Sequence, residues 1–214
     1  MNHSYRHGRL SMQWMTGTAM MIALTLVLAS TPLGRITMPF LTATTLHIPV
    51  ILATLVLGWE SGVLTGLVFG VHSLISNLTG ASFFAPFFIN PLVSVLPRVL
   101  FPLCVYAVQA AAGRILGGRD RNRYISCVLA SALGTAAHTT MVMGMIWLLY
   151  SGRIADMLVS GAGVPDAIAA RGVGAGIAAM GIGNGLPEMI VAAVIAPVLA
   201  VALDRAVGRI QKRR

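Results

Sequence analysis

The residues best suited to chemistry in this chain are a few polar side chains that interrupt long apolar segments, and Arg98 is the most unusual of them. It follows Pro97 within NPLVSVLPRVLFPL, residues 90–103, where nearly every neighbour is hydrophobic. A guanidinium presents a planar fork of donors that can hold a carboxylate through two parallel hydrogen bonds. Arg98 therefore predicts a site for a small organic anion, with a structural salt bridge to Glu188 as the alternative.

Glu188 and Asn184 lie in NGLPEMIV, near the end of the chain. They are four residues apart, so they would share one face of a helix. Pro187 and the glycines before it loosen this helix, and freed backbone groups tend to line a cavity rather than to face lipid. His138 lies toward the middle of another apolar segment. We therefore expect Arg98, His138, Asn184 and Glu188 to converge on one pocket.

Three further polar residues are candidates for the same pocket, namely His47, Asn77 and Asn90. Each candidate also has a structural interpretation. His138 could be a buried core histidine, and His47 could only cap the helix that starts before Pro49. Asn90 could only form the turn that precedes a proline.

The composition identifies an integral membrane protein. Hydrophobic residues make up 57% of the 214 residues and charged residues only 10%, against roughly 25% charged residues in soluble domains. The net charge of +9 comes from basic residues at the ends of apolar segments, which indicates membrane topology rather than a nucleic-acid partner. Cys104 and Cys127 show no metal-ligand or disulfide spacing, so we expect no metal site.

The apolar segments predict an all-α fold, a compact bundle of six transmembrane helices. We expect one membrane domain over residues 12–205, between a cytoplasmic segment 1–11 and a basic cytoplasmic tail 206–214. The predicted helices cover residues 12–30, 46–58, 61–78, 92–114, 124–150 and 174–204, with a tight GWES turn between the second and the third.

The distribution of basic residues predicts the orientation. Eleven of the fifteen lie in the N-terminal segment, the 114–123 connection or the tail, whereas three lie in the other connections. The positive-inside rule then places both termini in the cytoplasm and the connections 31–45, 79–91 and 151–173 outside.

Small residues recur at helical spacing in three segments and predict close helix packing. They are Gly58, Gly62, Gly66 and Gly70 around the third helix, Ala130 and Gly134 with His138 on the fifth, and Ala19 and Ala23 on the first.

Three stretches carry a resemblance to a known family: LHIPVILATLVLGWESGVLTGLVFGVHSLISNL, FFAPFFINPLVSVLPRVL and NGLPEMIVAAVIAPVLAVAL. Their order and spacing resemble the membrane-embedded substrate-binding subunits, or S components, of energy-coupling factor (ECF) transporters. The resemblance covers roughly residues 12–205. It implies a multi-pass protein of a prokaryotic plasma membrane that binds a vitamin from outside.

The resemblance also implies partners. S components dock on a shared transmembrane coupling subunit that two cytoplasmic ATPases drive, and they are thought to topple in the membrane to carry the ligand inward. The family meets this subunit through an alanine-xxx-alanine pair on the first helix, which Ala19 and Ala23 match. The chain has no GxxxxGK[ST] phosphate loop, so we expect the partners to use ATP and this chain to be no enzyme and to hold no cofactor.

Among S components the sequence looks most similar to those for pantothenate. On that resemblance Arg98 would hold the carboxylate, and Asn184, Glu188 and His138, with His47 and Asn90, would meet the hydroxyls and the amide. Four phenylalanines of the outer loop, Phe83, Phe84, Phe87 and Phe88, would form an apolar lid, or would only anchor the loop at the membrane interface. Folate, riboflavin, cobalamin and a queuosine precursor remain as alternative ligands.

Two other classes of protein compete with this interpretation. An intramembrane hydrolase could use Ser82 and His138 as nucleophile and base, but no orienting group accompanies them. A solitary secondary transporter could use Glu188 or His138 to carry a coupling proton. Dependence of uptake on ATP would separate the last class from an ECF transporter.

Overall fold

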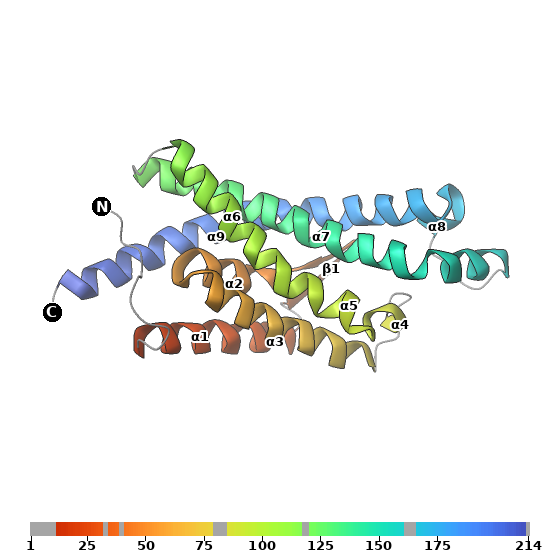
Figure 1. Ribbon diagram of the computed structural model, residues 1–214, viewed down its shortest axis with the longest axis horizontal. Helices are drawn as coiled ribbons and strands as arrows, with labels where there is room; N and C mark the ends of the chain where they lie inside the picture. The colour runs from red at the N-terminus through yellow and green to blue at the C-terminus, as the bar shows by residue number, and fades with distance from the viewer. Residues whose placement is uncertain are drawn as a thin grey trace.

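The computed structural model describes residues 12–31, 34–38, 41–78, 85–116, 120–160 and 166–212, and these form a bundle of helices with one small hairpin of strands (Figure 1). The elements are α1 Met12–Ala29, β1 Arg35–Met38, β2 Leu41–Thr44, α2 His47–Leu52, η2 Ala53–Leu57, α3 Trp59–Leu78, α4 Ala85–Phe88, α5 Pro91–Ser94, α6 Leu96–Leu116, α7 Asp120–Val159, α8 Asp166–Arg171 and α9 Val173–Lys212.

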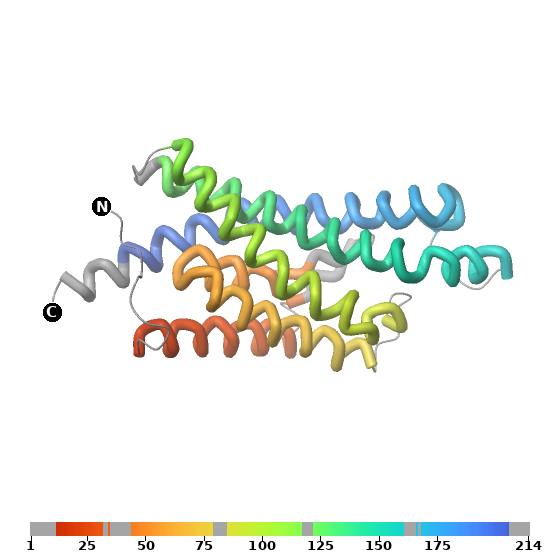
Figure 2. The backbone as a smooth tube through the Cα atoms, in the orientation of Figure 1, coloured from red at the N-terminus to blue at the C-terminus, as the bar shows by residue number. Residues whose placement is uncertain are grey.

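Five of the predicted spans are helices that are long and apolar enough to cross a membrane. They are Met12–Ala29, Trp59–Leu78, Pro91–Leu116, Asn122–Val159 and Val173–Arg205. The start of α1 and the C-terminal part of α9 lie at the same end of the bundle, on the left of Figure 2. We call this the terminal end and the opposite one the distal end. The placement agrees with both termini lying on one side of the membrane, and the cytoplasmic identity of that side stays a prediction.

The predicted second span is shorter than a membrane-crossing helix. It consists of α2 and the π-helix η2, six and five residues long, and at 1.5 Å per residue it falls well short of a hydrocarbon core of about 30 Å. All its residues except Leu57 are buried. The described residues therefore contain five helices long and apolar enough to span a membrane, and the predicted second span is a short helix inside the bundle.

The helices α7 and α9 are longer than predicted, at 40 residues each. The extra turns of α9 follow Asp204. The turns of α7 beyond Tyr150 pack at the distal end with α8, where Ile154 and Ile168 are fully buried in a second apolar core. The prediction ended α7 at Tyr150 because polar residues follow there. Contacts with α8 and α9 supply the burial that these turns lack by themselves.

The helical fold is as predicted, and the described residues add one small hairpin of strands to it. The connection 31–45 contains β1 and β2, which pair antiparallel from Arg35 with Thr44 to Met38 with Leu41. Strand residues such as Ile36 and Thr42 have the β-branched side chains that suit this conformation. Each strand has only four residues, too few for the alternating pattern to show against an apolar background.

The predicted glycine ridge packs α3 against α5 and α6. An added Cβ at Gly66 would lie 2.1 Å from the backbone oxygen of Arg98, and one at Gly70 would lie 2.8 Å from the Cα of Val95. Gly58 does not belong to this ridge. It precedes α3 with φ of 103°, and it makes the turn out of η2 that other residues rarely adopt.

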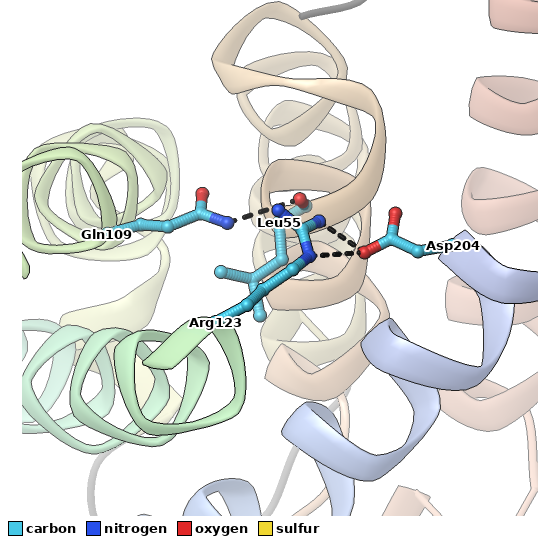
Figure 3. Close-up of polar contacts among 4 residues, drawn as sticks. All are labelled: Leu55, Gln109, Arg123 and Asp204. Atoms are coloured by element: carbon cyan, nitrogen blue, oxygen red, sulfur yellow. Dashed lines mark hydrogen bonds and ion pairs between the residues drawn. The ribbon is translucent and has the colours of Figure 1, made fainter. Parts of the chain in front are cut away.

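Two polar contacts hold the terminal end together (Figure 3). The Gln109 side chain of α6 donates to the backbone oxygen of Leu55 within η2, at 3.3 Å. Arg123 of α7 pairs with Asp204 of α9, with Nε 2.7 Å from Oδ2. The first contact satisfies a carbonyl of the π-helix, and the second joins the two longest helices of the bundle.

Candidate functional site

Arg98 lies in the first turns of α6 and is 6% exposed. Pro97 has no N–H, so the backbone oxygen of Val93, four residues earlier, lacks its usual helical donor. The guanidinium of Arg98 replaces that donor, with Nη1 2.7 Å from the Val93 oxygen. The Pro97–Arg98 pair therefore fixes the arginine side chain against α5, the short helix that precedes α6.

Two aromatic rings cover the Arg98 guanidinium. Its central carbon lies 5.4 Å from the centroid of Phe69 and 5.0 Å from that of Phe88, within the range of a cation–π interaction. The Nε atom is buried and has no hydrogen-bond partner. Arg98 thus keeps an unused donor at the edge with which guanidinium groups hold carboxylates.

Two buried histidines have no hydrogen-bond partner on either ring nitrogen. His138 of α7 is 6% exposed, and its ring centroid lies 5.0 Å from that of Phe101. His47 begins α2 and is fully buried. Backbone groups of Thr44 and Glu188 lie close to the His47 ring. Each imidazole can both donate and accept, and leaving these groups unpaired in a buried place is unfavourable.

Glu188 of α9 is 7% exposed, and a residue of the hairpin holds its carboxylate. Its Oε1 accepts the backbone N–H of Thr44 at 2.8 Å and the hydroxyl of Thr44 at 2.7 Å. Arg98 donates elsewhere, so the structural salt bridge between Arg98 and Glu188 is not formed. A guanidinium and a carboxylate are therefore buried near each other with hydrogen-bonding capacity to spare.

These four side chains form one group, which we call the buried polar cluster: His47, Arg98, His138 and Glu188. Glu188 is within electrostatic range of Arg98 and His47, and His138 is within range of the same two residues. The convergence of α6, α7 and α9 predicted from the sequence is thus present for Arg98, His138 and Glu188, and α2 adds His47.

Close packing brings the helices of the cluster together. The Gly66 contact described above seats α3 on the backbone of Arg98. An added Cβ at Gly134 would lie 2.3 Å from Val105 of α6, which confirms close packing at this position, and His138 contacts Phe101 of the same helix. Asn184 is half-buried one turn from Glu188 on α9, and its contact with a ligand stays a prediction.

The remaining predicted ligand contacts are engaged elsewhere. The Asn90 side chain caps α5 by accepting from Leu92 N–H at 3.0 Å, and it donates to the Tyr150 hydroxyl at 3.0 Å. The Asn77 amide donates to the Ser73 backbone oxygen at 2.7 Å. The geometry therefore favours the turn-forming interpretation of Asn90 and gives no support to a ligand contact of Asn77.

The predicted lid divides into three parts. Phe83 and Phe84, like Ser82, lie outside the described residues. Phe87 is 2% exposed and packs in the distal core, 4.9 Å from the Tyr150 ring. Of the lid residues that the structure describes, Phe88 alone covers a residue of the cluster, through its ring over Arg98.

Sequence reasoning missed three residues that complete the site, namely Thr44, Phe69 and Phe101. Phe69 contacts both Arg98 and His138, with its ring centroid 6.3 Å from the His138 ring. An aromatic residue between glycines of the α3 ridge was the available signal. Thr44 had none, because its contact with Glu188 joins residues 144 positions apart.

Two hollows lie on outer faces of the bundle and do not include the cluster. One, of about 630 Å³, runs between α7 and α9 past Gly144 and Ile182, and the other, of about 290 Å³, lies between α6 and α7 beside Leu96. Both linings are almost wholly apolar. In the described part of the chain, no group of three or more His, Cys, Asp or Glu residues could hold a metal ion.

Comparison with known proteins identifies a family and one similar transporter. The chain is 31% identical to the pantothenic acid transporter PanT of Lactococcus lactis subsp. cremoris, over 52% of this chain and 59% of that protein. The match thus spans less than two thirds of this relative. The profile of the ECF transporter, substrate-specific component family matches residues 13–200. This chain therefore belongs to the family of substrate-specific components of ECF transporters, multi-pass proteins of the prokaryotic plasma membrane.

Proposed function

We propose that this chain is the pantothenate-binding subunit of an ATP-driven importer. The observation that carries the proposal is the buried guanidinium of Arg98, whose Nε has no partner. A buried arginine that makes no direct ion pair in the described part of the chain keeps a donor for an anion that arrives from outside.

The rest of the cluster suits the other groups of pantothenate, which has two hydroxyls and an amide besides its carboxylate. The unpaired rings of His47 and His138 can donate to and accept from such groups. Glu188 can accept a hydrogen bond from a hydroxyl of the ligand. The similarity to PanT, a pantothenic acid transporter by name, supports the same choice of ligand.

Transport requires a partner that this chain does not supply. We infer that α1 docks on the ECF coupling subunit through Ala19 and Ala23, and that two ATPases bound to that subunit hydrolyse ATP. Ala19 and Ala23 are both exposed, on the helix that buries the smallest share of its residues among the five spans. Small exposed residues four positions apart let a second helix approach closely.

Calorimetry on the purified chain in detergent tests the choice of ligand, with pantothenate, riboflavin, folate and cobalamin run in parallel. We expect one-to-one binding of pantothenate and no binding of the other three. Binding of another vitamin in place of pantothenate would overturn the ligand and leave the family membership intact.

A further inference from the structure

We propose that Thr44 is a positioning residue of this site: it orients the Glu188 carboxylate so that one oxygen is held and the other is turned to the ligand. The inference rests on the function proposed above. Thr44 is the last residue of β2. The proposal therefore gives the hairpin, which the sequence did not predict, a role in binding.

The contact has the geometry of an orienting device. Both donors of Thr44, its N–H and its hydroxyl, meet the same atom of Glu188, at 2.8 and 2.7 Å. Two donors on Oε1 fix the rotation of the carboxylate about its last bond. In the described part of the chain no hydrogen bond reaches Oε2, so this oxygen remains as an acceptor.

The surroundings of Glu188 make this role necessary. Among the described residues no cation forms an ion pair with the carboxylate, although Arg98 and His47 lie within electrostatic range of it. Without Thr44 the carboxylate could turn toward either of these groups and occupy donors that the ligand needs. Thr44 therefore holds the Glu188 carboxylate in an orientation that leaves the donors of Arg98 and His47 to the ligand.

Substitution of Thr44 by valine provides the test, because valine has the same shape and leaves the backbone N–H in place. Thr44→Ser restores the hydroxyl and serves as the rescue variant. Thr25→Val is the matched control: Thr25 is fully buried in α1, and its hydroxyl bonds only the Met21 backbone oxygen, at 2.8 Å.

The first readout is independent of any ligand. Glu60 and Glu188 are the only glutamates in the sequence, so isotope-labelled glutamate in a Glu60→Gln background gives an infrared carboxylate band from Glu188 alone. We expect Thr44→Val to shift this band, Thr44→Ser to restore it and Thr25→Val to leave it unchanged. An unshifted band in Thr44→Val would overturn the inference.

The second readout is pantothenate affinity by calorimetry. We expect Thr44→Val to weaken binding about tenfold, as expected for the loss of one hydrogen bond to a charged group. In a Glu188→Gln background the same change should have less than about a twofold effect, because Thr44 acts through the carboxylate. Equal losses in both backgrounds would contradict a positioning role.

The two readouts separate this inference from the proposed function. If the unaltered chain binds no pantothenate, the ligand proposal fails, and the infrared band still decides whether Thr44 orients Glu188. If pantothenate binds but Thr44→Val changes neither the infrared band nor the affinity, only the positioning role fails.

Discussion

Pro97 and Arg98 act together on one backbone carbonyl, that of Val93. Pro97 leaves the Val93 carbonyl without a donor, and Nη1 of Arg98 takes its place. The guanidinium is thereby held between Phe69 and Phe88 with its Nε edge free. A side chain anchored in this way can receive a carboxylate with little further loss of conformational entropy.

His138 gives a prediction at the residue scale about the balance of stability and function. Its unpaired ring nitrogens destabilise the empty protein, so His138→Leu should raise the melting temperature in detergent, by the equivalent of about 1 kcal/mol. The same variant should bind pantothenate about tenfold more weakly. Thermal unfolding without ligand and calorimetry with ligand measure the two effects, and a variant that loses stability as well would show that His138 is a core residue.

The helices approach the buried polar cluster at glycines, and Gly66 of α3 lies directly against the backbone of Arg98. Gly66→Ala would place a methyl group against the Arg98 backbone oxygen. We expect a loss of about 1–3 kcal/mol in stability, as for other overpacked sites, together with weaker pantothenate binding. Thermal unfolding and calorimetry check both.

Gly113 offers the matched control within α6, since an added Cβ there meets no atom within 4 Å. Gly113→Ala should therefore leave binding unchanged and should not lower the melting temperature. Equal behaviour of the two alanine variants would contradict the close contact at Gly66.

The exposed pair Ala19 and Ala23 on α1 leads to a prediction about docking. Ala19→Trp should leave pantothenate binding intact and abolish uptake, because the larger side chain blocks the approach of the coupling subunit. Leu133→Trp is the control, because Leu133 is 52% exposed on α7, away from α1. Uptake assays in proteoliposomes with the full complex measure transport. Loss of uptake in both variants would mean that the effect is not specific to α1.

The sequence predicted the elements that depend on apolar length and small-residue spacing. The five spans and the packing faces of α3 and α7 fall in this class, as do Arg98, His138 and Glu188 as neighbours. The hairpin, the buried π-helix and the extra turns of α7 were not predictable, because tertiary contacts stabilise them. Thr44 belongs with this second group, since its place depends on the register of β1 and β2.

At the scale of the whole molecule, the proposed function assigns the energy source of transport to the ATPases that would bind the coupling subunit. Uptake by the reconstituted complex should therefore require ATP and should persist when the proton gradient is collapsed. Uptake by this chain alone, driven by a proton gradient, would instead indicate a secondary transporter that uses Glu188 or His138.

The most direct test of the account compares pantothenate with panthenol, its alcohol analogue, which lacks only the carboxylate. We expect the unaltered chain to prefer pantothenate by about 10- to 100-fold, the range for a charged hydrogen-bonded contact. Arg98→Gln should bind both compounds with similar affinity, with a melting temperature checked alongside because Arg98 also holds Val93. A preference for pantothenate that survives in Arg98→Gln would contradict the assignment of Arg98 as the carboxylate-binding residue.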